Sequence, residues 1–248
     1  MATSNSTNFD LTANQICTSA LRKCNVIGEG ETPSTAILAE ALEVLNVLLK
    51  SLESAGMPLW RITEYTLTPV AGTASYTVGT GATVSQHAPL KIHQAWNRVS
   101  NNDSPLIILP YHDYNMLGNK TSPGTPSQIY YKTPAGPAGS EMVGTVYLYP
   151  VPDANFVTTN SGTIKFTGTA AFQDADSSSN NLDFPSCWLQ AIIWGVADQM
   201  CYQVGVPLAE RAMIAKKAQQ ETQMALNYGT EEGSFRIWPS PDWQWETY

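Results

Sequence analysis

The residues that could perform chemistry in this 248-residue chain are few and scattered. His87 and His93 lie in or beside a predicted strand, and His112 lies farther along the chain. No aspartate or glutamate stands near them at a spacing typical of a zinc site. We interpret all three as loop or surface histidines and predict no metal site.

Two further patterns only superficially resemble reactive sites. Residues 118–121, Gly-Asn-Lys-Thr, resemble the end of a phosphate-binding loop, but no glycine precedes them at the required spacing and asparagine precedes the lysine. Glu29 with Glu31 and Glu231 with Glu232 lie in glycine-containing linkers, which cannot preorganise acid-base catalysis. The common hydrolase, metalloprotease, dinucleotide-binding and calcium-binding motifs are missing from the sequence. We therefore predict no catalytic residue and no cofactor, and interpret the chain as not an enzyme.

Cysteine use and charge narrow the class of protein. Cys17, Cys24, Cys187 and Cys201 lie in or at the ends of predicted helices at spacings unlike those of zinc or redox motifs. They are typical of small buried side chains in a reducing compartment.

Thirteen Lys and Arg against twenty-one Asp and Glu give a net charge of -8, so the molecule should repel duplex DNA. No stretch is apolar enough to predict a membrane span.

The elements that must position these residues are helical at both ends of the chain. Apolar residues at helical spacing run from Thr12 to Cys24, and a second helix is expected with Thr32 as N-cap and Pro33 at the first helical position. Two more helices are predicted after Pro185 and after Pro207, ending near Gly205 and Asn227 respectively.

The middle of the chain has the pattern of short strands. Alternating or aromatic-rich segments are separated by Gly and Pro turns, which predicts an antiparallel β region with long loops and one short helix at 111–117. The expected strands are 64–68, 75–78, 90–99, 128–132, 143–149 and 163–167.

These elements predict an α+β fold. Two N-terminal and two C-terminal helices should form a four-helix bundle, from which a long antiparallel β-rich insertion departs. The expected divisions are an N-terminal helical hairpin at 1–61, the insertion at 62–183, a C-terminal hairpin at 184–229 and an extended tail at 230–248. We interpret the tail as a docking arm for a partner, and packing along its own domain is the alternative. The tail holds five aromatic residues: Phe235, Trp238, Trp243, Trp245 and Tyr248.

This order of elements, together with several short motifs, resembles the head-to-tail adaptors, or connectors, of short-tailed bacteriophages. That group includes tail tubular protein A and the head-closure proteins that stabilise packaged DNA. The motifs are ALRK at 20–23, VIGEGE at 26–31, the run 39–52 leading into AGMPLW at 55–60, LYPVPD at 148–153, FP at 184–185 and AIIW at 191–194.

The resemblance implies a structural protein of the virion, assembled in the host cytoplasm and located at the head-tail junction. Its copies would form a ring, commonly a dodecamer, below the portal protein. The ring would extend the DNA channel, help retain the packaged genome without binding it specifically, and give a platform for tail nozzle or fibre proteins.

The main alternative is a carbohydrate- or receptor-binding module of a phage tail. Trp96, Tyr130 and Tyr131 lie in the loop-rich β region and could stack on sugars if they were exposed. The helices that split around the sheet argue against such a module, which would normally stand alone as a sandwich. For the aromatic rings we favour ordinary packing within the sheet, on the general burial of such side chains.

Overall fold

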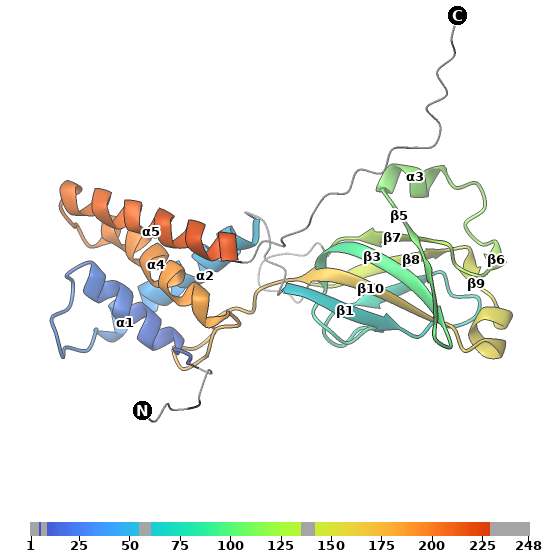
Figure 1. Cartoon of the computed structure of the whole chain (residues 1–248), viewed down its shortest axis with the longest axis horizontal. Helices are drawn as coiled ribbons and strands as arrows, with labels where there is room; N and C mark the ends of the chain where they lie inside the picture. The colour runs from blue at the N-terminus through green and yellow to red at the C-terminus, as the bar shows by residue number, and fades with distance from the viewer. Residues whose placement is uncertain (1–4, 6–8, 55–60, 135–141, 229–248) are drawn as a thin grey trace, which may run out of the picture.

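A computed structural model describes residue 5 and residues 9–54, 61–134 and 142–228. The chain has a mixed α+β fold in which the long helices gather at one end of the molecule and the sheets at the other (Figure 1). Each end has its own hydrophobic core. The domain divisions predicted from the sequence stay a prediction.

Four long helices share the helical core: α1 (Ala13–Lys23), α2 (Thr35–Ser54), α4 (Leu189–Gln203) and α5 (Leu208–Tyr228). Helix α4 contacts each of the other three, and buried residues such as Ile192, Val196 and Met200 lie along it. A helix this apolar must be covered on several sides, so α4 is the centre of the helical part.

Local signals explain where these helices begin. Thr12 caps α1, because its hydroxyl accepts a hydrogen bond from the Gln15 amide while the Gln15 side chain accepts one from the Thr12 amide. The predicted start of α2 was wrong: the helix begins at Thr35, and Ser34 caps it by accepting a hydrogen bond from the Ile37 amide. Thr32 therefore lies outside the helix.

Two four-stranded sheets face each other across the second core, in the orders β1-β10-β3-β4 and β2-β8-β7-β5. Tyr65 and Phe166 stack in this core with ring centroids 5.0 Å apart. The strands are β1 (Ile62–Leu67), β2 (Ser75–Val78), β3 (Pro89–Val99), β4 (Asn102–Pro105), β5 (Ile107–Leu109), β6 (Pro123–Gly124), β7 (Gln128–Lys132), β8 (Gly144–Tyr149), β9 (Val151–Pro152) and β10 (Thr163–Ala170).

The six strands expected from the sequence are confirmed to within a few residues, as is the short helix, which is α3 (Tyr111–Met116). The wholly antiparallel arrangement was wrong, since β5 pairs with β7 and β6 with β9 in parallel. Two strands can pair in parallel only when the chain between them is long enough to return to the same end of the sheet. The connection from β5 to β7, which contains α3, is long enough for this.

Arg61 lies where the helical part and the sheets meet. The residue is 2% exposed, and its guanidinium donates hydrogen bonds to the Ala170 carbonyl and, at 3.0 Å, to the Asp183 carboxylate. The guanidinium also lies 3.8 Å from the centre of the Phe172 ring. Burial lowers the pKa of Arg61, whereas the carboxylates of Asp183 and Glu53 raise it. One cation thus connects the start of the β-rich region with two later segments, 109 and 122 residues farther along the chain.

We predict that Arg61→Ala lowers the free energy of unfolding by about 2–4 kcal/mol, because it removes charge-assisted hydrogen bonds and a cation-π contact from a buried position. Arg98→Ala is the matched control. Arg98 pairs with Asp103 on the surface, so its loss should change the free energy of unfolding much less than the loss of Arg61. Urea unfolding of both variants measures the difference, and equal losses would show that Arg61 has no special role.

Candidate interaction surfaces

The described side chains that could perform chemistry do not gather into one site, and two of them, His93 and Lys120, make structural contacts. The His93 ring nitrogen Nε2 lies 2.6 Å from the Thr169 hydroxyl, and His112 is exposed on α3. Lys120, in the segment that resembles a phosphate loop, instead donates to the carbonyls of Asn115 and Leu117 at the end of α3. Within the described ranges, no three His, Cys, Asp or Glu side chains gather in a way that could hold a metal ion.

Three of the four cysteines are buried in the helical core, as expected. The Sγ atoms of Cys24 and Cys201 lie 3.7 Å apart, and Cys24 donates to the Ala197 carbonyl. Burial raises the pKa of Cys17 to about 11 and that of Cys24 to about 12. The expectation was wrong for Cys187, which is exposed because it lies in the single 3₁₀ turn (Ser186–Trp188) before α4.

A cluster of tyrosines, here called the tyrosine surface, covers the outer face of the second sheet. Tyr130 of β7 and Tyr147 of β8 are direct cross-strand partners with ring centroids 5.6 Å apart. Tyr114 of α3 stacks on Tyr130 at 4.8 Å, and Tyr111 lies 6.0 Å from Tyr130. These rings point away from the core, because their strand neighbours Ile129, Val146 and Leu148 are the buried ones.

Exposed apolar side chains extend the tyrosine surface. Tyr111 is 68% exposed, Ile107 of edge strand β5 is 61% exposed and Met116 at the end of α3 is 73% exposed. Large apolar side chains gathered in one region of a soluble protein commonly mark a contact site for another macromolecule.

Two of the three aromatic residues considered for sugar binding, Tyr130 and Tyr131, are packed against neighbouring side chains. The hydroxyl of Tyr131 donates to the Pro89 carbonyl at 2.6 Å, and its ring packs against the sheet core. Tyr130 packs against Tyr114 and Tyr147, whose own ring centroids are 5.3 Å apart, so the three rings form a triangle. Trp96 is half-buried, with its Nε1 atom inaccessible to solvent. Tyr131 therefore offers no open ring, whereas Trp96 lines a groove of about 620 Å3 together with Leu106 and Ile108.

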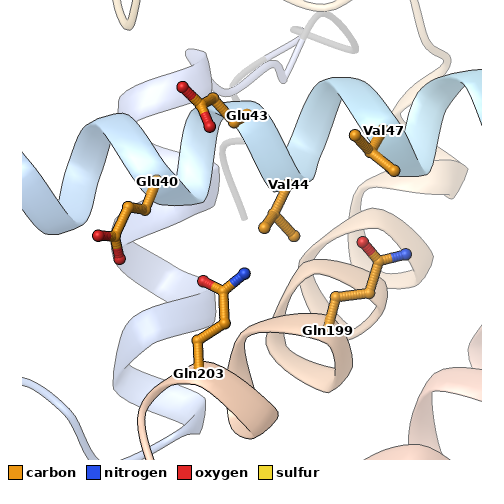
Figure 2. Close-up of a pocket in the computed structure, with 6 residues that line it drawn as sticks. All are labelled: Glu40, Glu43, Val44, Val47, Gln199 and Gln203. Atoms are coloured by element: carbon orange, nitrogen blue, oxygen red, sulfur yellow. The ribbon is translucent and has the colours of Figure 1, made fainter.

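A groove of about 650 Å3 separates α2 from α4 in the helical part (Figure 2). Glu40, Glu43, Val44 and Val47 line it from α2, and Gln199 and Gln203 from α4. The valines give the groove apolar surface, since Val47 is 62% exposed. In the described part of the chain, neither glutamate forms an ion pair. The groove is thus acidic and partly apolar.

The aromatic residues expected to dock a partner lie outside the described residues, and their role stays a prediction. They are Phe235, Trp238, Trp243, Trp245 and Tyr248. The groove and the tyrosine surface were not identified from the sequence. The signals that were present are an exposed valine among the leucines of α2, and a tyrosine beside buried apolar residues in each of two strands, Tyr130 after Ile129 and Tyr147 between Val146 and Leu148.

Comparison with protein-family models matches residues 11–241 to the SU10 adaptor protein family. The chain belongs to this family. The match spans both the helices and the sheets, and it confirms the resemblance to phage head-to-tail adaptors at the level of the family; membership of the tail tubular group stays a prediction. No curated protein matches the chain.

The SU10 adaptor family identifies the chain as a structural protein of a bacteriophage virion, whose partners are in general the portal and tail proteins. Among the described helices of the adaptor, none combines the length and apolar character needed to cross a membrane. For a structural adaptor, the α2–α4 groove and the tyrosine surface are the two features best suited to contacts with neighbouring proteins.

The thiol environments of the adaptor predict its labelling pattern. A native sample treated with an alkylating reagent near pH 7.5 should be modified at Cys187, because the three buried thiols are inaccessible and Cys17 and Cys24 are not ionised at that pH. Mass spectrometry of the intact chain should show one added group, four after denaturation, and none in native Cys187→Ser. Rapid native labelling of a second cysteine would contradict the packing of the helical core.

Proposed function

We propose that this adaptor forms a ring below the portal protein, with its four helices acting as one four-helix bundle. The ring extends the DNA channel, helps to retain the packaged genome and provides a platform for tail nozzle or fibre proteins. The observation that carries the proposal is the match to the adaptor family across both the helices and the sheets. A dodecamer is the ring size that the resemblance to short-tailed phage adaptors favours.

The arrangement of the molecule supports a role as a connector. Its helices and its sheets have separate cores at opposite ends, so different faces are available to different neighbours (Figure 1). We assign contacts within the ring and to the portal to the helices, and contacts with the tail to the β-rich region and its tyrosine surface. The exposed residues Ile107, Tyr111 and Met116 make that surface the better candidate for a tail protein.

The charge of the chain also suits a DNA channel. The net charge of -8 gives few cations to neutralise phosphates, so a ring of such subunits repels the duplex and lets it slide. This accounts for passage of packaged DNA without specific binding.

The first test is single-particle imaging of the chain mixed with rings of its cognate portal protein. We expect a layer of added density with rotational symmetry about the portal axis. A control with a portal protein from an unrelated phage should remain bare. A subunit that stays monomeric in the presence of its own portal rings would refute the proposal.

The second test concerns residues 230–248, which we propose as the docking arm. If the arm contacts a neighbour and not its own subunit, deleting these residues should leave the subunit's unfolding midpoint within about 2 °C of the intact chain, since little intramolecular contact is lost. Attachment to portal rings should fall strongly, as measured by co-sedimentation.

The matched control for the deletion keeps the length and replaces the arm's tryptophans: Trp238→Ser, Trp243→Ser and Trp245→Ser. This variant should attach as poorly as the deletion, because aromatic anchors dominate the binding energy of interfaces. A large loss of monomer stability with normal attachment would assign the arm to the subunit's own core.

A further inference from the structure

We propose that the outer face of helix α5 in one copy packs into the α2–α4 groove of the next copy. This inference rests on the proposed ring and names the two surfaces that would build it. The occupant is a second copy of this chain, because α5 presents a positive charge that complements the acidic groove and apolar side chains that can pack on the groove's valines.

The groove is a receptor for a helix by its size and lining. Residues 40–47 of α2 extend along about 11 Å of helix, so the groove can receive about two turns of another helix. Val44 and Val47 offer apolar contact, whereas Gln199 and Gln203 offer hydrogen-bond donors and acceptors. Glu40, which lies on the side of Gln203 in Figure 2, and Glu43 also line the groove. Neither has a cationic partner among the described side chains.

Helix α5 has two distinct faces. Ile214, Ala218 and Ala225 lie on the buried face, toward α4. The opposite face is exposed along its described length and contains no carboxylate. Its exposed residues are Ala209, Ala212, Met213, Lys216, Gln219, Gln220, Gln223, Met224 and Asn227. Small alanines allow close approach of another helix, and methionines adapt to an uneven apolar surface.

The charges on α5 favour the acidic groove. Lys217 is already paired with Glu221, at 2.6 Å between Nζ and Oε1. Lys216, on the exposed face, forms no ion pair with any described residue. With Met213 against the valines of the groove, Lys216 is one turn farther along α5 and can reach Glu40 or Glu43. The exposed apolar area and the unpaired charges are thereby covered together.

The proposed contact has a symmetry consequence. The groove and the α5 face share no residue, so each subunit uses one surface as donor and a different one as acceptor. Such a head-to-tail contact gives a closed ring, or a filament if the rotation does not close, and does not give a two-fold dimer.

Disulfide trapping in the full-length chain tests the contact directly. The background is Cys187→Ser, which removes the exposed thiol, and the test pair is Val47→Cys with Met213→Cys. Oxidation in the presence of cognate portal rings should give a ladder of covalent multimers. The matched control pair is Val47→Cys with Met116→Cys. Met116 is 73% exposed and Met213 66%, so the two cysteines are similarly accessible, but the control pair should give no ladder.

Charge reversal gives a second readout with uncrosslinked protein. Glu43→Lys alone and Lys216→Glu alone should each weaken ring occupancy on the portal by about fivefold, because each places like charges together. The double variant should recover most of the loss. Glu43 lines the open groove and Lys216 is exposed, so the unfolding midpoints of the charge-reversal variants should remain those of the parent chain.

The outcomes separate this inference from the proposed function. A symmetric ring in images, with equal trapping by the test and control pairs or with no rescue by the double charge reversal, overturns the contact and leaves the ring intact. A disulfide between Val47→Cys and the portal protein, in place of a second copy, also overturns it. Absence of any ring overturns the proposed function itself.

Discussion

The buried guanidinium of Arg61 is the contact on which the arrangement of the two cores depends. The chain leaves the helical part after α2, builds both sheets, and returns after β10 to form α4 and α5. Arg61 binds the Ala170 carbonyl at the end of β10 and the Asp183 carboxylate before α4. It therefore links the segment that leaves the helical part with the segment that returns to it. A buried cation requires such partners, because an unpaired charge in the interior is strongly destabilising.

A second set of contacts reinforces this junction from α2. The Asn46 side chain both donates to and accepts from the Ala175 backbone, and Lys50 pairs with Asp174 at 2.7 Å and donates to the Phe172 carbonyl. Phe172 in turn stacks on Phe184, with centroids 4.4 Å apart. The returning segment is thus fixed along α2 before α4 enters the helical core. Since α4 must be covered by helices from both ends of the chain, this closure is what completes that core.

This construction explains how one small chain can serve as a connector. Each end of the molecule has a core of its own, so the exposed surface at either end need not contribute to stability and can be given to a neighbour. The tyrosine surface covers the outer face of a sheet whose inner face is already buried, and the α2–α4 groove lies beside a helix that is already covered. The surfaces left exposed belong to a protein of the SU10 adaptor family, whose role is to join other proteins.

The sequence by itself determined the elements and their order, and through short motifs the family. A cap such as Thr12, a proline such as Pro185 and the alternation of Ile129 with Tyr130 are local signals that act within a few residues. Only the tertiary structure decided the parallel pairing of β5 with β7, the exposure of Cys187, the buried role of Arg61 and the two candidate surfaces. Pairing and burial depend on which distant segments meet, and an arginine or tyrosine at one position carries no local mark of the neighbours that will cover it.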